Sequence, residues 1–548
     1  MNAKTIAVCL LLAAATLQAQ SAGGVAGISG VVRDQSGAAV PNAKVVISSD
    51  SQGNVRGLLT NSEGVFTAPA LVPGPGYRIT ITAAGFNVYE ATNLDLKVGQ
   101  DVDLRAALTV GQASTQIDVT SEAPIVDDTK VDVSTVVDTR SIQDLPINGR
   151  RVDSFVLLTP GVTNDATFGL LAFRGVAGNN SFLVDGNDGT EQFYDENAGR
   201  TRIASNISQD AVQEFQVLSA DFSAEYGRAM GGVVNTVTRS GGNQYHGTAY
   251  WFFRNKSFDA RDPLAAINPD ELRNQAGGSI GGPVLKDKLF FFGNVEVTRR
   301  NFPMVDSIVS SGIVDTNNQV WLGCAAPATP AQCSAINGLL PRFFGQIPRT
   351  LNQELYFGRM DYHLSERHTL SASFNFLHDV SPNGIQTGAT STSGSAINGN
   401  GDDAVRVRTG RLGWMAIPAS NMVNEARLGW FTDKQTDTFS NATLGQGLGL
   451  IALSVAGQSI GSTNYLPRTQ PNERRFHFAD NLSWTSGAHI AKAGVDLSLT
   501  RDYTYNIINY NGSYSYQTVT AFALDYSGNS SGAKHWNGNG NGLLRDLL

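Results

Sequence analysis

The 548-residue chain has little charge, few cysteines and, after its first residues, no long apolar run. Lysine, arginine, aspartate and glutamate make up only 16% of it, and the formal net charge is −8. This acidic balance lacks the basic footprint of a nucleic-acid-binding protein, so no nucleic-acid partner is expected. The 3 cysteines and 7 histidines form no cluster with metal-ligand spacing. The sequence therefore predicts no cofactor and no metal.

Catalytic motifs are missing as well, since no G-x-S-x-G, Walker loop or C-x-x-C pair occurs. The best metal candidate is YHLSERH, in which His363, Glu366 and His368 have ligand-like spacing. This motif lies between two alternating segments, GRMDYHL and HTLSASFNF, so its middle predicts a short turn. A zinc site also needs a third placed ligand and a dry pocket. We predict that the protein is not an enzyme, with a zinc carboxypeptidase as the alternative that metal analysis would reveal.

A second acidic run, VDGNDGTEQFYDE, does not fit a calcium-binding loop. Counting from Asp185, an EF-hand needs Asp or Asn at the fifth position and Gly at the sixth, where this chain has Gly189 and Thr190. We expect Asp185, Asn187 and Asp188 to form turn hydrogen bonds instead.

The one long apolar run is N-terminal, in MNAKTIAVCLLLAAATLQAQSAGG. Lys4 precedes an apolar stretch from Ile6 to Leu17, which has the length of a signal h-region, and small residues follow. Residues 1–20 are predicted to be the signal peptide of an exported protein, with a buried helix or a membrane anchor as the alternative. Outside the cytoplasm, Cys324 and Cys333 in WLGCAAPATPAQCS are predicted to form a loop disulfide.

Glycine is abundant, with 58 residues, and from 26 to 110 short strands alternate with Gly/Pro turns. This pattern predicts a small β-sandwich. Three motifs resemble the carboxypeptidase regulatory-like domain: G-x-V-x-D-x-x-G-x-x-V-P-x-A-x-V from Gly30 to Val45, NSEG from Asn61 to Gly64, and PGPGYRITITAAGF from Pro73 to Phe86. The resemblance implies a prealbumin-like fold of the carbohydrate-binding-like kind and indicates no activity.

From 114 to 240 the pattern predicts a small α/β domain. SIQDLPINGRRVDSFVLLTPGV predicts a short helix, a turn and a second helix, and short strands follow around glycines. Five motifs in this order, LPINGR, LTPGV, FRGV, FLVDG and EYGRAMGGVVNTVTRSGGNQYHG, resemble the plug domain of TonB-dependent outer-membrane receptors. With the sandwich before them, they resemble the Oar-like group of these receptors.

From 245 to 548 apolar and polar residues alternate, as in LSASFNFL and HIAKAGVDLSL. An apolar face opposite a Ser/Asn/Arg face predicts part of an antiparallel transmembrane β-barrel of roughly ten strands, with a soluble sandwich as the alternative. Long polar segments, at 305–351, 381–403 and 434–472, contrast with short turns elsewhere, which is the asymmetry of outer-membrane barrels. The predicted fold class is thus mainly β: a sandwich, a small α/β plug and a partial barrel.

The resemblance implies a family barrel of about twenty-two strands. Because an open half-barrel would leave backbone groups unpaired in lipid, we expect the chain to be a C-terminally truncated fragment of a longer receptor.

The resemblance also implies a location and partners. We expect a receptor or transporter in a Gram-negative type outer membrane, with the N-terminal domain in the periplasm. Its partners would be a TonB-type inner-membrane energising protein, outer-membrane lipid and an unknown extracellular ligand: a siderophore, glycan, peptide or protein. The energising protein would pull a short segment by strand addition. The candidate TonB box is Gln116, Ile117, Asp118, Val119 and Thr120, with an ordinary linker strand as the alternative.

Five plug residues are candidates for a latch onto the barrel: Arg150, Arg174, Asp185, Glu225 and Arg228. Buried charges need partners, and a polar lumen offers them, although solvated turns are the alternative. In GGVVNTVTRSGG, both glycine pairs are predicted to let the chain turn tightly around the last plug strand. The alternative to the receptor is a secreted or surface β-rich carbohydrate-binding or adhesion protein, which would fractionate with the soluble periplasm.

Overall fold

The structure is a computed structural model of the whole chain, and it describes most of it. The described residues are 24–51, 53–111, 132–164, 170–193, 196–197, 206–261, 263, 267–306, 312–315, 318, 320–340, 345–384, 390–391, 401–419, 421–439, 452–461, 466–486, 489–510, 512–528 and 534–536. The predicted signal peptide and the candidate TonB box lie outside these residues. Within them, no helix is both long enough and apolar enough to cross a membrane.

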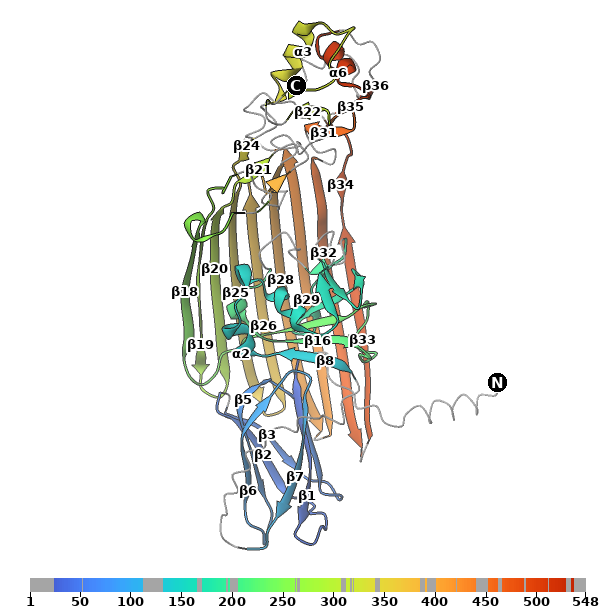
Figure 1. Cartoon of the computed structure of the whole chain (residues 1–548). Helices are drawn as coiled ribbons and strands as arrows, with labels where there is room; N and C mark the ends of the chain where they lie inside the picture. Colours follow the sequence, from blue (N-terminus) through green and yellow to red (C-terminus); the bar gives the residue numbers. More distant parts are fainter. Residues whose placement is uncertain are drawn as a thin grey trace, which may run out of the picture.

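Seven strands near the N-terminus form a β-sandwich, drawn in blue at the bottom of Figure 1. One sheet has the order β4-β1-β7 and the other the order β3-β2-β5-β6. The strands are β1 (Ala26–Asp34), β2 (Lys44–Ser49), β3 (Gly53–Leu59), β4 (Val65–Leu71), β5 (Gly74–Thr82), β6 (Tyr89–Leu96) and β7 (Asp101–Leu108). Alternating residues such as Ile79 and Ile81 on β5 are fully buried between the sheets. The sandwich therefore folds around its own apolar core.

The region from Val133 to Thr238, called the plug here, contains a five-stranded sheet with the order β13-β12-β17-β16-β8. Its strands are β8 (Val133–Val137), β12 (Ser181–Val184), β13 (Asn187–Asp188), β16 (Val212–Ala220) and β17 (Val233–Thr238). The two predicted helices are α2 (Thr139–Asp144) and a 3-10 segment, η2 (Val152–Leu158). The remaining pieces are η1 (Asn148–Arg150), β9 (Val162–Asn164), β10 (Leu171–Phe173), β11 (Val176–Ala177), β14 (Thr190–Glu191), β15 (Glu196–Asn197) and η3 (Gln209–Ala211).

The glycine pairs around β17 have a different role from the predicted one. Neither pair has a positive φ angle, so the chain does not use there the left-handed conformation that glycine permits. A side chain at Gly232 would overlap the ring of Phe173, and one at Gly241 would overlap the backbone of Phe291. These positions need glycine because other groups pack directly against the backbone.

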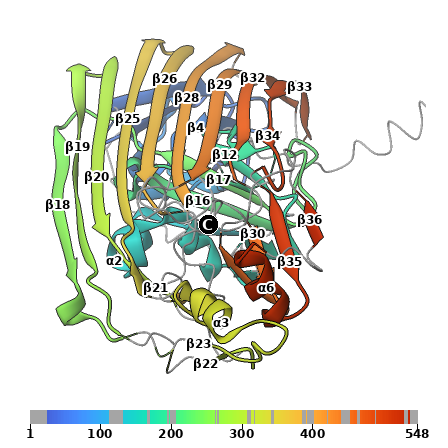
Figure 2. The same ribbon diagram turned by 90° about the horizontal axis from the view of Figure 1, so that it is seen from above.

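Ten strands form one antiparallel sheet, called the wall here, and this confirms the predicted barrel-type sheet. Figure 2 shows the wall curving around the plug. In sheet order the strands are β18 (His246–Asn255), β19 (Leu272–Leu285), β20 (Leu289–Asn301), β25 (Thr350–Ser365), β26 (His368–Ser381), β28 (Gly401–Ala419), β29 (Met422–Phe439), β32 (Arg468–Ser486) and β33 (His489–Asp502), with β34 (Tyr505–Asn506) beside β32. A short helix, η4 (Lys256–Phe258), follows β18.

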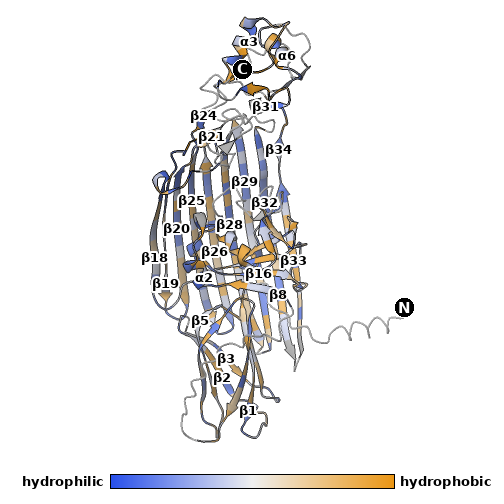
Figure 3. Cartoon of the chain, in the orientation of Figure 1, coloured by the Kyte–Doolittle hydropathy of each residue, from blue (hydrophilic) through white to orange (hydrophobic). Residues whose placement is uncertain are grey.

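Side chains of the wall alternate between the two faces, and Figure 3 shows the resulting mixture of hydropathies along its strands. On β28, Arg411 is buried against the lumen side while Leu412 and Trp414 are exposed on the outer side. Nearer the long-loop end the polarity is reversed, because Val405 and Val407 are buried and the residues beside them point outward. The short connections between strands all lie at the end of the wall that carries the sandwich (Figure 1).

The polar segments predicted as loops are more structured than expected. Parts of two of them, 305–351 and 434–472, join the segment 513–536 in a small folded unit beyond the wall, called the cap here (Figure 1). Its core joins Trp321 and Ile336 to Val455 and to Tyr516 and Phe522. The cap elements are β22 (Val314–Asp315), β23 (Val320–Trp321), α3 (Pro330–Asn337), β30 (Ala452–Val455), β31 (Gln458–Gly461), β35 (Ser513–Tyr516), α6 (Val519–Tyr526) and β36 (Lys534–Trp536). A three-stranded sheet of β21 (Met304–Asp306), β24 (Gly345–Ile347) and β27 (Thr390–Ser391) lies between the wall and the cap.

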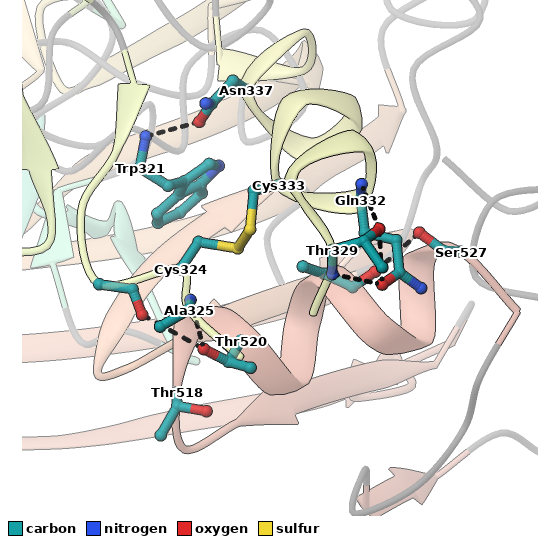
Figure 4. Close-up of a disulfide and its surroundings, with 12 residues drawn as sticks. Trp321, Cys324, Ala325, Thr329, Gln332, Cys333, Asn337, Thr518, Thr520 and Ser527 are labelled. Atoms are coloured by element: carbon teal, nitrogen blue, oxygen red, sulfur yellow. Dashed lines mark hydrogen bonds between the residues drawn. A yellow bond between two sulfur atoms is a disulfide. The ribbon is translucent and has the colours of Figure 1, made fainter. Parts of the chain in front are cut away.

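Cys324 and Cys333 form a disulfide within the cap (Figure 4). It joins the segment after β23 to helix α3, which begins with a capping box between Thr329 and Gln332. The backbone N–H of Ala325 donates to the hydroxyl of Thr520 on the neighbouring α6, at 3.1 Å. The disulfide therefore lies where the first cap segment meets the last.

Candidate functional site between the plug and the wall

The plug contacts the wall through several buried ion pairs, called the latch pairs here. They arise because the inward positions of the wall strands carry charged residues at plug height, opposite charged turns of the plug. Each pair joins residues more than 100 positions apart in the chain, so only the folded structure brings them together.

The first latch pair joins Arg150 of η1 to Glu296 of β20. The Nε atom of Arg150 lies 3.5 Å from Oε2 of Glu296, and its Nη2 atom lies 2.6 Å from Asp210 of the plug. The guanidinium stacks over the ring of Tyr250 on β18, 4.0 Å from its centroid. Glu296 also accepts hydrogen bonds from Ser208 of the plug and from Gln275 of β19. One plug arginine is thus held by two wall strands at once.

The second latch pair joins Asp185 to Arg359 of β25, at 3.4 Å. Asp185 has a φ of 48° and is followed by Gly186 at 71°, so the predicted turn aims its carboxylate back along the plug. That carboxylate accepts from the N–H of Thr238, at 2.9 Å, and from the Thr238 hydroxyl, at 2.8 Å. Arg359 is held in place by a bidentate contact with Asp361. The end of β17 is therefore tied to the middle of the wall.

Asp188 was expected only to stabilise a turn, and its Oδ1 atom does accept from the N–H of Thr190, at 2.9 Å. Its Oδ2 atom makes the third latch pair, accepting from Arg475 of β32 at 3.0 Å. The side chain of Arg475 is fully buried, and it lies over the ring of Phe431. Arg228 contacts the same carboxylate at 3.2 Å from the exposed side of the plug.

The fourth latch pair joins Glu225 to Lys492 of β33, at 3.0 Å, with both side chains mostly buried. Arg174 differs from the other four candidates. It lies in an exposed turn, and within the described part of the chain its side chain forms no ion pair. Of the five predicted residues, the structure places Arg150, Asp185 and Glu225 against the wall, Arg228 beside a latch pair, and Arg174 away from the interface.

The wall partners were not predicted from the sequence: Glu296, Arg359, Arg475 and Lys492. A signal was present, because each is a charged residue at the inward position of an alternating strand. The pairing could not be predicted, since it depends on the register of the wall against the plug.

The plug also contacts the sandwich. Glu214 of β16 accepts a hydrogen bond from the backbone N–H of Val98, at 3.0 Å, and Gln213 donates to the carbonyl of Pro73, at 2.6 Å. Burial raises the pKa of the Glu214 carboxyl to about 8, while the Val98 hydrogen bond lowers it and the nearby Asp95 raises it. This contact therefore contains a group that titrates near neutral pH.

The candidate metal ligands His363, Glu366 and His368 do not form a set of metal ligands in the structure. Glu366 and Arg367 form the turn between β25 and β26, as the alternation predicted. Among the residues that the structure describes, no group of three or more His, Cys, Asp or Glu side chains is arranged to hold a metal ion.

Two protein families match the chain. The family described as outer membrane beta barrel domain matches residues 237–310 and 303–540, and the family described as carboxypeptidase regulatory-like domain matches residues 27–109. The chain therefore belongs to the outer-membrane β-barrel family, and its location is the outer membrane.

Two curated relatives are described as TonB-dependent proteins. The TonB-dependent transporter Oar from Myxococcus xanthus is 22% identical over 530 residues, which cover 84% of this chain and 48% of the relative. The probable TonB-dependent siderophore receptor PirA from Acinetobacter baumannii is 28% identical over 210 residues, covering 35% of this chain and 26% of the relative. The chain spans at most about half the length of these relatives, which are transporters and receptors rather than enzymes.

Two solved structures are also similar to parts of the chain. The outer membrane transporter YddB from Escherichia coli has a TM-score of 0.49 at 12% identity, covering 70% of this chain and 50% of YddB. The crystal structure of PirA has a TM-score of 0.47 at 15% identity, with the same two coverages.

Proposed function

We propose that the chain belongs to a plug-gated receptor that takes up a ligand across the outer membrane, powered by a TonB-type inner-membrane protein. The observation that carries this proposal is the set of latch pairs, which join the plug to the wall by charge beside a smaller apolar contact of the plug core with Phe292 and Phe357 of the wall. Removing both partners of such pairs from water offsets most of their attraction, so they fix geometry at little net stability. A gate needs both a fixed geometry and little net stability, because it must close the lumen in one position and still be displaced from it.

The position of β8 supports a route for the pulling force. β8 is the first plug strand after residues 112–131, where the candidate TonB box lies, and it forms the edge of the plug sheet. Among the strands that the structure describes it pairs only with β16, and Val137 is its one buried residue. Tension on Gln116–Thr120 would therefore reach the least buried strand of the sheet first, and peel it from β16 before any latch pair is loaded.

The sandwich and the cap occupy opposite ends of the wall (Figure 1). Since outer-membrane barrels have short turns on the periplasmic side and long loops outside, we place the sandwich in the periplasm and the cap on the cell exterior. The ligand would meet the cap first. The relative named as a probable siderophore receptor supports a ferric siderophore as the first ligand class to test.

Uptake in cells tests the proposal. A receptor lacking residues 116–120, expressed in the native host, should bind a radiolabelled ferric siderophore at the parent level and accumulate none inside. Unchanged accumulation would refute the TonB-box assignment. Absence of binding to every siderophore of a chemically varied panel would refute the ligand class. The gate would still be testable by pulling on the plug.

A further inference from the structure

The outer face of the wall carries a cluster of cations just beyond its apolar part. Arg406 and Arg408 on β28, Lys434 on β29, Arg474 on β32 and Arg501 on β33 are all exposed. Their neighbours Val405, Val407, Asp433, Glu473 and Arg475 are buried on the inner face. Because side chains alternate along a strand, the five cations share the outer face. We call them the cation cluster.

The strand register brings these cations next to one another. Arg406 is directly opposite Lys434, and Arg474 is directly opposite Arg501. Thr432 lies between Arg408 and Arg474 in the same row of the sheet. Directly opposed residues of neighbouring strands have Cα atoms about 5 Å apart, and like charges in that position destabilise the sheet.

The part of the protein that the structure describes does not neutralise the cluster, because none of the five cations forms an ion pair there. Arg408 lies over the ring of Phe376, 5.7 Å from its centroid. A similar cation outside the cluster behaves differently, because Arg299 on the same face pairs with Glu354 at 2.6 Å. Within the described residues these two cross-strand pairs of like charge have no counterion from the chain, so an anion from outside it would relieve their repulsion.

An apolar hollow lies directly below the cluster on the same face. Its volume is about 960 Å³, and its outward lining includes Met360, Phe374, Leu412, Leu428, Trp430 and Phe476. The row of residues next below Arg408 contains Gly358, Phe374, Gly410 and Trp430, in strand order. The two glycines leave space between the large side chains.

We propose that the cation cluster and the hollow together bind one phosphate-bearing acylated lipid of the outer leaflet, with its phosphates between the arginines and an acyl chain in the hollow. The cluster lies toward the long-loop end of the wall, at the level where an apolar band gives way to charge. In an outer-membrane protein that level is the headgroup region of the outer leaflet. Arginine binds phosphate by paired hydrogen bonds, and cations at a membrane surface attract anionic lipid. This inference does not depend on the proposed uptake function.

Lipid binding to the purified full chain tests the charge requirement. Native mass spectrometry in detergent would follow titration with bisphosphorylated lipid A. The triple variant Arg406→Gln/Arg408→Gln/Arg474→Gln should bind roughly 100-fold more weakly than the parent. The matched control Lys286→Gln/Lys288→Gln/Arg367→Gln removes three exposed cations at the short-turn end and should stay within about 3-fold of the parent. Equal binding by both triple variants would overturn the proposal.

Two further arms identify the chemistry. Inorganic phosphate at millimolar concentration should fail to displace the lipid, because it lacks the acyl chain. Displacement would reassign the cluster to a free anion. The double variant Gly358→Leu/Gly410→Leu fills the hollow and leaves the cations in place. A Cβ at Gly358 meets nothing within 4 Å, and one at Gly410 meets only Trp430 at 3.6 Å, so the fold should tolerate it. It should bind the lipid at least about 10-fold more weakly, and parent-like binding would refute the acyl site.

Discussion

The plug meets the wall through charged pairs and a few apolar contacts, whereas the cap is built around an apolar core of its own. The latch pairs are charged contacts between plug residues and wall strands, and beside them Phe292 and Phe357 of the wall join the apolar core of the plug. The cap instead has an apolar core built from three separate segments, with the rings of Trp321, Tyr516 and Phe522 in contact. Apolar cores are lost cooperatively, whereas isolated ion pairs can be released one at a time. We therefore expect the latch pairs to be released separately, and the cap to unfold as one body.

The largest expected effect is at the fully buried Arg475. Arg475→Met removes the partner of Asp188 and leaves a buried carboxylate beside Glu473, which should destabilise the plug–wall contact by about 3–5 kcal/mol. Hydrogen exchange of the plug amides should speed up, with the cap unaffected. Arg228→Met is the matched control on the same carboxylate. Its side chain is 52% exposed, so about 0–1 kcal/mol is expected. Equal effects of the two variants would show that the burial of Arg475 does not determine the strength of this latch pair.

A substitution at the centre of the cap should affect the cap and leave the plug unchanged. Phe522→Ala opens a cavity where the three cap segments meet and should destabilise the cap by about 3–5 kcal/mol. Limited proteolysis should then cut all three cap segments together and spare the plug. Gln517→Ala, at an exposed position near the same helix, should change stability by less than about 0.5 kcal/mol. Cleavage of a single segment would show that the cap is not cooperative.

A pH dependence is expected at the contact between plug and sandwich. The folded-state pKa of Glu214, about 8, lies above the usual value of 4.5, so the folded protein binds this proton more tightly than the unfolded protein. The stabilisation is fully present below about pH 4.5 and is lost as the pH rises toward 8. For one proton the slope reaches at most about 1.4 kcal/mol per pH unit. Thermal melting between pH 5 and 8.5 should show the decline, and Glu214→Gln should flatten it; an unchanged slope would exclude Glu214.

The sequence predicted the class of the fold well because alternation and turn residues are local signals. The strands of the sandwich, the period of two along the wall and the turn at Glu366 depend on near neighbours only. The latch residues were predicted in part, since Asp185 and Glu225 are charges in a domain expected inside a lumen. Their partners Arg359 and Lys492 could not be predicted, because their register spans more than a hundred residues. The cap was missed because its core is divided among three segments, none of which has a strong pattern alone.

Pulling on the plug tests most directly whether it is a separable unit that yields from β8. A force probe would be attached through Asp118→Cys to the protein in a membrane. The first event should release the plug through Thr238 and lengthen the chain by about 420 Å. A second variant adds Asn187→Cys and Gly429→Cys. A Cβ at Gly429 would lie 3.7 Å from Cγ of Asn187, which suits a disulfide between plug and wall. With that bond formed, extension should stop at about 240 Å, and reduction should restore the longer event. Extraction of wall strands before the plug, or equal lengths with and without the bond, would contradict the account.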